Sequence, residues 1–317
     1  MQEIGRQYSK DDKTDPSGFL RRARLHQSKY RAETLNLPFD GFGNYLTKAD
    51  GEIGKNFYED FGIFEAVKKY RKYNKPLYSN MLRSEHIPFN FFIPLNQDKI
   101  FCRNVFNEFM NSNIQTIDRI EIEYAPYPAA KYLNDRTSFD TYIEYTHIDN
   151  SKGIIGVEVK YTEREYPLIK YQINKKTGEK ELTKAWIDVE NYKNQKSDSI
   201  YLNVTKKSKL FKEEYQMDLI KDDFRQVWRN HILGESILQT DKDKFKRFTS
   251  LTLFPKDNEH FVKTSKDYKY ILNNNDNKFI SLMYEDFFAF LSKHCPDNNY
   301  KKWLEYLINR YIIKEKL

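Results

Sequence analysis

The sequence predicts a mixed α/β fold of the α+β kind, in which helices surround a mixed sheet. Three neighbouring segments alternate apolar and polar residues with the period of two that is typical of strands, at 117–124, 138–145 and 153–161. A segment with helical spacing precedes these strands at 99–111, and another follows them at 218–238. A further strand is expected after the second helix, at 248–254. The predicted order is therefore helix, three strands, helix, strand.

Further helices are predicted ahead of this order. Residues 19–36 form a basic segment of helical character, and residues 56–74 repeat aromatic and aliphatic residues at helical spacing. The glycines between these two segments indicate a loop at 37–55. The apolar segment 82–95 is also expected to be helical, although Pro88 interrupts it.

The second half of the chain is predicted to contain an insertion and two terminal helices. Residues 164–215 are polar and lysine-rich, and residues 279–316 have helical spacing. These patterns divide the chain into three regions. They are an N-terminal helical, basic region (1–75), a core with its insertion (76–262) and a C-terminal helical region (263–317). The first 18 residues are expected to be a loose tail.

Composition and charge narrow the class of protein. Charged residues make up 31% of the chain and the net charge is +7. This mild excess fits a polyanionic partner when the charge is unevenly placed, and it equally fits a basic surface without a partner. The two cysteines, Cys102 and Cys295, share no motif, which argues against a disulfide framework and against a cysteine-based zinc site.

Several other classes lack their sequence signals. No histidine pair has ligand spacing, and no Walker A or Rossmann glycine pattern occurs, which argues against zinc, ATP-driven and nicotinamide enzymes. No apolar run approaches the ~18 residues of a membrane span, and the first residues lack the apolar core of a signal peptide. We therefore expect a cytoplasmic protein without membrane contact.

The chemistry is expected at Glu158-Val159-Lys160, because alternation along a strand puts the carboxylate and the ammonium on one face. If the preceding strand pairs with this one as a hairpin, Asp140 comes within reach of Glu158. Two carboxylates and the Val159 carbonyl are the oxygen ligands that Mg²⁺ takes, and Lys160 can orient the attacking water or stabilise developing charge. Taken alone, the same spacing also fits a solvated strand face with an ordinary salt bridge.

The wider sequence resembles the PD-(D/E)XK nuclease superfamily, and within it a bacterial group of restriction-endonuclease-like proteins. The resemblance rests on two strand motifs and on four shorter segments in the expected order, R-T-S-F-D (136–140), G-V-E-V-K-Y-T-E (156–163), Q-S-K-Y-R (27–31), F-N-F-F-I-P-L (89–95), E-Y-A-P (123–126) and Q-V-W-R-N (226–230). It covers about residues 20–255. No proline precedes Asp140, and the lysine-rich stretch matches no segment of the family pattern.

This resemblance implies a restriction-endonuclease-like core and a Mg²⁺-dependent DNA endonuclease, with Mn²⁺ as a substitute, that works in restriction or phage defence. It makes Asp140, Glu158 and Lys160 the catalytic core. A fourth group usually completes such a site, and Glu123 is preferred over Glu85 as a further metal ligand. Gln226 would hold a water or Lys160. The alternative for each of these three added residues is a plain surface side chain.

The resemblance and the basic segment together suggest how the nucleic acid is held. Four residues of the segment, Arg24, Gln27, Tyr30 and Arg31, are predicted to contact DNA phosphates. In the alternative, Arg24 or Arg31 pairs with a carboxylate such as Glu33 and only stabilises the helix. The expected partners are DNA and either a second copy of the chain or a partner protein of a defence system. Duplex DNA, single-stranded DNA and RNA all remain open as targets.

A rival interpretation is a catalytically silent nuclease fold that holds DNA or a partner protein. The intact set of Asp140, Glu158 and Lys160 argues against it, because an inactive copy is free to lose these residues. A third interpretation is an interaction protein whose helical C-terminus mediates assembly.

Overall fold

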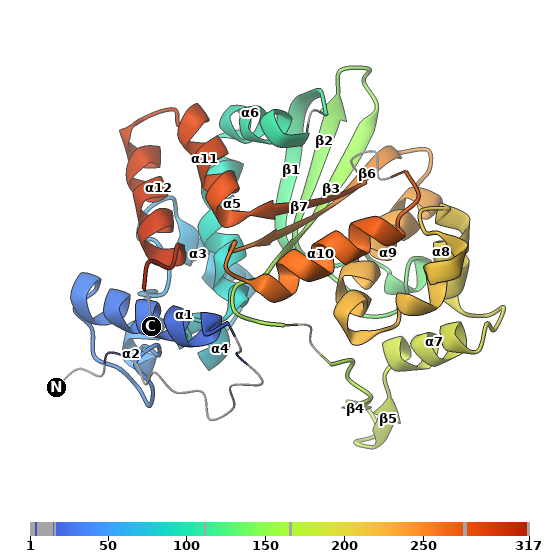
Figure 1. Ribbon diagram of the computed structural model, residues 1–317, viewed down its shortest axis with the longest axis horizontal. Coiled ribbons are helices and arrows are strands. Elements are labelled where there is room, and N and C mark those ends of the chain that lie inside the picture. The colour runs from blue at the N-terminus through green and yellow to red at the C-terminus, as the bar shows by residue number, and fades with distance from the viewer. Residues whose placement is uncertain are drawn as a thin grey trace.

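A five-stranded mixed sheet forms the centre of the molecule (Figure 1). The computed structural model describes residues 4, 15, 17–110, 112–164, 167–274 and 278–315. The strands follow the order β1-β2-β3-β6-β7, and their bounds are β1 (Ile114–Tyr124), β2 (Phe139–His147), β3 (Lys152–Val159), β6 (Phe245–Phe254) and β7 (Phe279–Met283). The first three strands pair antiparallel, whereas β3 with β6 and β6 with β7 pair parallel. The predicted mixed sheet is confirmed.

One face of the sheet is covered by helices from both ends of the chain (Figure 1). A single hydrophobic cluster joins this face to Ala23 near the N-terminus and to Trp303 near the C-terminus. The helices on this side are α1 (Phe19–Lys29), α2 (Lys48–Glu52), α3 (Ile63–Tyr70), α4 (Lys75–Ser79), α5 (Ile87–Gln97), α6 (Lys99–Met110), α11 (Tyr284–His294) and α12 (Asn298–Tyr311). The N-terminal and C-terminal regions therefore share one core with the sheet.

The opposite face carries a second cluster, centred on α9 (Asp222–Thr240). This helix lies close against β6, since a Cβ atom on Gly234 would stand 2.0 Å from the Phe248 ring. Around it lie α7 (Lys184–Lys193), α8 (Ile200–Ser208) and α10 (Glu259–Ile271). This arrangement holds the first turns of α9 next to the end of β3.

The lysine-rich stretch expected as an insertion is partly built into this second cluster. It begins with a two-stranded hairpin, β4 (Tyr171–Ile173) and β5 (Lys180–Leu182), which has no buried residue. It continues with α7 and α8, whose Tyr192 and Tyr201 pack on the Trp228 ring with centroids 4.8 and 5.5 Å away. The hairpin therefore has the exposure expected of an insertion, whereas α7 and α8 contribute to the core.

Several predicted elements have different ends. The helix expected at 19–36 is α1 followed by a π-helical turn, Tyr30–Thr34. The helix expected at 56–74 begins only at Ile63, because Gly62 adopts a φ of 60° that ends the preceding turn. Pro88 lies in the first turn of α5 and does not interrupt a helix, and the residues before it form a short 3-10 turn, Ser84–His86. Two further 3-10 turns occur, at Ala129–Lys131 and Glu213–Asp218.

Among the elements that were not predicted from the sequence are β7 and α10. The segment expected to hold two terminal helices starts with β7, and α10 lies between β6 and β7. The strand β7 is short and pairs along one edge only, with Leu251 opposite Ile280, so its existence depends on a distant partner. Across the described residues, no helix is long and apolar enough to cross a membrane.

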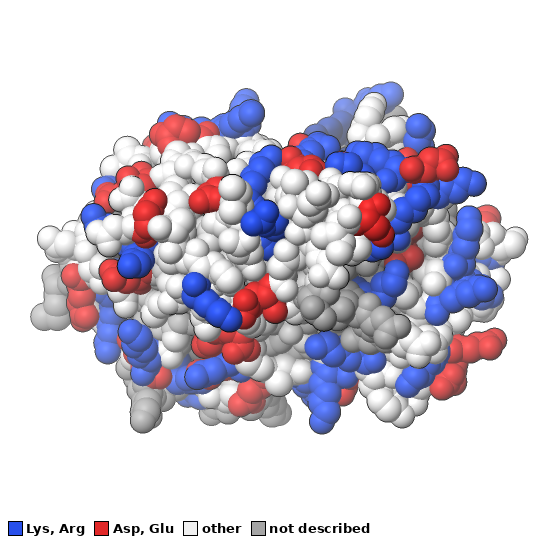
Figure 2. Space-filling view, turned by 90° about the horizontal axis from the view of Figure 1, so that it is seen from above, with Lys and Arg blue, Asp and Glu red and all other residues white. Residues whose placement is uncertain are grey.

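Charge is spread over the surface seen from above, over α6, α11 and the β2–β3 hairpin (Figure 2). Acidic and basic side chains are interspersed there, and lysine and arginine crowd one half of the view. The basic side chains on this face are therefore unevenly placed.

Candidate active site

Asp140 and Glu158 occupy neighbouring positions on β2 and β3. The two strands pair antiparallel with Thr141 opposite Val157, so the same register continued by one residue sets Asp140 opposite Glu158. The backbone N–H of Val159 donates a hydrogen bond to Asp140 Oδ2 over 2.7 Å. This bond fixes the Asp140 carboxylate against the end of β3.

Glu158 and Lys160 form a buried ion pair at the end of β3. Lys160 Nζ lies 2.6 Å from Glu158 Oε1, and the two residues are only 2% and 5% exposed. The backbone of Lys160 is held as well, since its N–H donates to Leu253 O over 2.8 Å and its carbonyl accepts from the Tyr284 hydroxyl over 2.6 Å. A charge pair this deep in the protein requires further hydrogen bonds to offset its desolvation.

Those further bonds come from α9. Gln226 Nε2 donates to Glu158 Oε1 over 2.7 Å, and Asn230 Nδ2 donates to Glu158 Oε2. The two amides lie one helical turn apart, so both project from one side of the helix. Gln226 Oε1 is buried and accepts no hydrogen bond from the described residues. It is therefore an acceptor available to a water or to a substrate group.

Asn230 is a site residue that the sequence analysis missed. It is buried, and its amide donates directly to the Glu158 carboxylate. A signal was present, because a residue four places after Gln226 faces the same way on a helix. The sequence analysis assigned a role on this helix face to Gln226 and not to Asn230.

The electrostatics of the site are dominated by closely placed carboxylates. Burial raises the pKa of Asp140 well above its ordinary value, and the negative charge of Glu158 raises it further. Lys160 and the Val159 N–H act in the opposite direction. Two carboxylates held together in a poorly solvated place repel each other, and a cation between them relieves that repulsion.

The comparison with protein families decides what kind of site this is. A family model described as the PD-(D/E)XK nuclease superfamily matches residues 10–313. The chain belongs to the PD-(D/E)XK nuclease superfamily. Searches of curated proteins and of solved structures gave no match. The predicted superfamily is confirmed, and with it a nuclease fold that binds nucleic acid and generally uses divalent metals. The bacterial restriction-endonuclease-like group stays a prediction.

The donors at this nuclease site suit a hard cation. Within the described part of the chain, no group of three or more His, Cys, Asp or Glu side chains could hold a metal ion. Mg²⁺ does not need such a group, since it usually takes one or two carboxylates and keeps waters and substrate oxygens as its other ligands. Two carboxylates, Asp140 and Glu158, lie together here, and the raised pKa of Asp140 agrees with a place for positive charge.

Glu123 extends the row of carboxylates onto β1. Its neighbours Ile122 and Tyr124 lie opposite Thr141 and Phe139, so Glu123 lies opposite Asp140. Its charge contributes to the raised pKa of Asp140. Glu123 adopts a φ of 54°, which is uncommon for a residue other than glycine and tends to occur at functional sites.

Glu123 and Glu85 are already paired with arginines. Glu123 forms an ion pair with Arg71, and Glu85 Oε1 lies 2.9 Å from Arg83 Nη2. Both carboxylates raise the pKa of Arg71, and the effect of Glu123 is the larger one. Glu123 therefore belongs to the row of site carboxylates, whereas Glu85 lies on a separate 3-10 turn near it.

The basic helix α1 lies beside the site but turns three of its predicted nucleic-acid contacts inward. Gln27 is buried and donates to the Tyr161 hydroxyl over 2.8 Å, next to Lys160 in the chain. Tyr30 is buried against Tyr306, and Arg31 is buried with its Nε donating to Gly43 O over 2.6 Å. The protein itself thus covers Gln27, Tyr30 and Arg31, which leaves these side chains little exposed surface for a direct phosphate contact.

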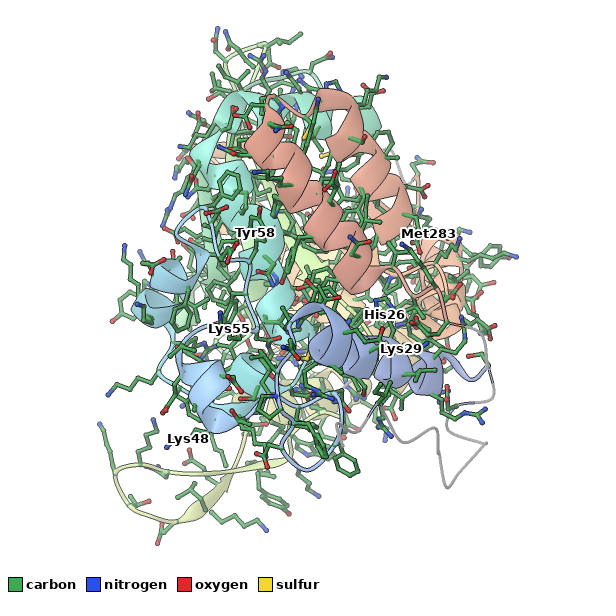
Figure 3. All side chains as sticks on the ribbon, turned by 90° about the vertical axis from the view of Figure 1, so that its left-hand side faces the viewer. His26, Lys29, Lys48, Lys55, Tyr58 and Met283 are labelled. Atoms are coloured by element: carbon green, nitrogen blue, oxygen red, sulfur yellow. The ribbon has the colours of Figure 1, made fainter. Side chains whose placement is uncertain are left out.

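Contacts with the end of α12 hold α1 in this place (Figure 3). His26 Nδ1 lies 2.6 Å from Glu315 Oε2, and its Nε2 lies 3.2 Å from Arg310 O. Gln27 also donates to Arg310 O, over 2.6 Å. Of the four predicted contact residues, Arg24 alone is half-buried and not fully covered. The helix therefore serves mainly to brace the end of β3.

Proposed function

We propose that this nuclease-superfamily protein is a Mg²⁺-dependent endodeoxyribonuclease that works in restriction or phage defence. The observation that carries the proposal is the convergence of Asp140, Glu158 and Lys160 at the end of β3. The defence role rests on the resemblance of the strand motifs to the bacterial restriction-endonuclease-like group. DNA is the proposed partner, and a second copy or a defence protein is a further proposed partner.

Asp140 and Glu158 would hold the metal, with Mn²⁺ as a substitute for Mg²⁺. The Val159 carbonyl is the proposed third protein oxygen. Glu123 is the proposed fourth group, and it would have to release Arg71 in order to bind the cation. Bound there, a divalent cation lowers the pKa of a coordinated water and stabilises charge on the phosphate being attacked. Glu85 is a weaker candidate ligand, because it lies on a separate 3-10 turn and not in the row of strand carboxylates.

Lys160 and Gln226 would position the attacking water. The Lys160 ammonium donates toward Glu158 and can donate to a water that replaces this contact. Gln226 keeps Glu158 in place with its Nε2 and offers its free Oε1 to a water proton. Positioned donors and acceptors of this kind act without reorganisation during the reaction.

An assay with plasmid, linear duplex and single-stranded DNA, each with Mg²⁺, Mn²⁺ or EDTA, tests the proposal. We expect new strand ends in plasmid DNA with either metal and none in EDTA. The matched control is Glu121→Ala, since Glu121 is a carboxylate on β1 that pairs with Arg119 away from the row. Cleavage that persists in EDTA, or that survives loss of Asp140, contradicts the assignment.

A second candidate function is a catalytically silent module that holds DNA or a partner protein. One observation favours it: both oxygens of Glu158 already have protein partners, and the residue is 5% exposed. Metal binding separates the two candidates. A melting temperature that rises with Mg²⁺ in the wild type but not in Asp140→Asn supports the enzyme. An unchanged melting temperature together with intact DNA supports the silent module.

A further inference from the structure

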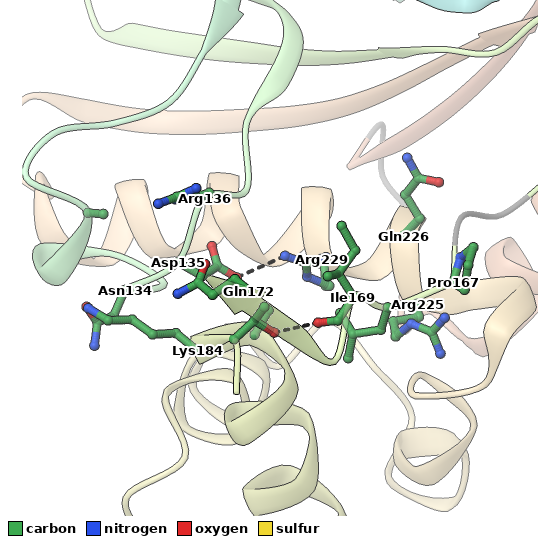
Figure 4. A pocket seen from close by; sticks show the side chains of 14 residues that line it. Asn134, Asp135, Arg136, Pro167, Ile169, Gln172, Lys184, Arg225, Gln226 and Arg229 are labelled. Carbon is green, nitrogen blue, oxygen red and sulfur yellow. Dashed lines mark hydrogen bonds and ion pairs between the residues drawn. The ribbon is translucent and has the colours of Figure 1, made fainter. Parts of the chain in front are cut away.

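A pocket of about 600 Å³ opens beside the carboxylate site (Figure 4). It lies between the loop that precedes β2, the first turns of α9, and the segment that leads into β4. Gln226 lines the pocket with one side and donates to Glu158 with its amide. The pocket and the candidate active site therefore adjoin at this side chain. Its size falls within the ~300–1,000 Å³ of pockets that hold small ligands.

The lining combines apolar walls with positive charge. Ala129, Pro167, Leu168, Ile169 and Ala185 supply the apolar walls. Four cations also line it, Arg136, Lys184, Arg225 and Arg229. Among the described residues that line the pocket, the acidic one is Asp135, whose carboxylate lies 3.0 Å from Arg229 Nη2. An occupant with a flat apolar face and a negative charge matches this lining.

Two amides in the lining are oriented by the protein. Asn134 Oδ1 accepts a hydrogen bond from Lys184 Nζ over 2.8 Å, which leaves its amide N–H groups for another acceptor. Gln172 Nε2 donates to Glu181 over 2.8 Å, which leaves its carbonyl for another donor. Fixed donors and acceptors of this kind suit the polar edge of a nucleobase.

We propose that this pocket receives an unstacked base of the DNA strand, next to the phosphate bound at Asp140 and Glu158. This inference rests on the proposed function and narrows its substrate. The apolar walls cover the faces of the base, and the exposed cations Arg136 and Lys184 hold the adjoining phosphates, since Arg225 and Arg229 already pair with Asp222 and Asp135. A base inside a duplex is stacked on its neighbours and does not reach such a pocket. The preferred substrate is therefore a single strand, or a duplex with an unpaired base at the cut.

Filling the pocket tests this proposal. Ala129 lines the pocket, whereas Ala130 is its exposed neighbour and does not. Ala129→Trp therefore fills the space, and Ala130→Trp is the matched control. Each full-length protein is titrated in EDTA against three ligands: a short thymidine oligonucleotide, an abasic sugar-phosphate chain of the same length, and a thymidine–adenine duplex. Circular dichroism melting verifies that the variants fold.

The wild type and Ala130→Trp should bind the thymidine strand about tenfold more tightly than the abasic chain, because the base contributes stacking energy. Ala129→Trp should bind both chains equally, with the affinity that the phosphates alone provide. Binding of the duplex should not change among the three proteins. Equal affinity of the wild type for thymidine and abasic chains overturns the proposal, as does an Ala129→Trp variant that weakens the duplex and the single strand alike.

A second pair of variants covers the case in which Ala129→Trp does not fold. Leu168 lines the pocket from the segment that leads into β4, and Ile173 is exposed on β4 outside the pocket. Leu168→Ser should lose the preference for bases, and Ile173→Ser should keep it. Cleavage assays separate this proposal from the one above. Base-dependent binding without any metal-dependent cutting overturns the activity alone, and metal-dependent cutting with unaltered binding in Ala129→Trp overturns the pocket alone.

Discussion

At the scale of single residues, Asp140 combines a proposed catalytic role with an unfavourable position for its charge. Burial and Glu158 raise its pKa, so the ionised carboxylate opposes folding at neutral pH. We predict that Asp140→Asn lowers cleavage at least ~10³-fold, because parts of one metal site act as a unit. The same substitution should raise the melting temperature in EDTA, since the Val159 N–H keeps an acceptor and the repulsion disappears.

The two measurements for Asp140 are a cleavage rate with Mg²⁺ and a thermal melt in EDTA. Glu158 and Lys160 are less suitable for this comparison, because removal of one member of a buried pair leaves the other unpaired. An Asp140→Asn protein that is inactive and also much less stable would point to a structural role for this side chain.

His231 on α9 is predicted to make stability depend on pH. The residue is buried, and burial, assisted by Lys278, lowers its pKa to about 3. The folded protein keeps this ring neutral, whereas the unfolded chain binds a proton below about pH 6.5. Its contribution to stability is therefore complete above that pH and is lost as the pH falls toward 3, by ~1.4 kcal/mol per pH unit.

Urea denaturation at pH 7 and pH 5 tests this effect by comparing the wild type with His231→Phe. The wild type should lose ~2 kcal/mol more than the variant between the two pH values. Glu235 acts with the opposite sign, because burial raises its pKa and its stabilising, protonated form is lost as the pH rises. Glu235 is present in both proteins, so the difference between them isolates His231. Identical pH dependence in the two proteins contradicts the assignment.

At the scale of elements, α1 and the π-helical turn that follows it carry one structural arginine and one at the surface. Arg31 in the turn is buried and donates to Gly43 O and Leu37 O, whereas Arg24 on α1 is half-buried. We predict that Arg31→Gln lowers the free energy of unfolding by ~2–4 kcal/mol, because two buried carbonyls lose their donor. The dependence of DNA affinity on salt should not change in this variant.

Arg24→Gln is the matched comparison on that helix. If Arg24 contacts a phosphate, log affinity plotted against log salt should flatten by about one, with little change in stability. Urea denaturation and DNA titration at several salt concentrations give both quantities for each variant. If the plot of log affinity against log salt flattens with Arg31→Gln and stays unchanged with Arg24→Gln, the roles of the two arginines are the reverse of those assigned.

The sequence predicts the strands that carry the site better than the elements around them. Alternation reveals β2 and β3, and the spacing of Glu158 and Lys160 on one strand follows from that period alone. The short edge strand β7 is stabilised by pairing with β6, which no local period reports. The basic residues of the segment 19–36 predict an exposed surface, because charged side chains are usually exposed. Arg31 is nevertheless buried, and it donates hydrogen bonds to loop carbonyls.

At the scale of the whole molecule, the three sequence regions meet in one core. The cluster on one face of the sheet contains Ala23 and Phe57 from the first region, Ile155 from the core and Trp303 from the last. The end of β3, where Lys160 lies, is braced by Gln27 from the N-terminal side and by Tyr284 from the C-terminal side. The position of the site residues thus depends on chain segments far from the strand motifs.

This shared core predicts that the chain unfolds in one cooperative step, including its terminal helices. Trp303 on α12 is fully buried, and its Nε1 donates to Asn90 O on α5 over 2.8 Å. Trp303→Ala should lower the free energy of unfolding by about 3–5 kcal/mol, as expected for a large buried aromatic residue. Because α12 packs on the cluster that holds the sheet, the whole transition should move and no separate early transition should arise.

Calorimetry and urea denaturation followed by tryptophan fluorescence and by circular dichroism give the measurement. The control is Tyr270→Ala, which removes an aromatic side chain that is 64% exposed on α10 and should shift stability by less than about 1 kcal/mol. If Trp303→Ala instead produces an early transition that leaves the remaining secondary structure intact, the terminal helices fold independently of the sheet. The bracing of Lys160 from both ends of the chain would then not depend on a common core.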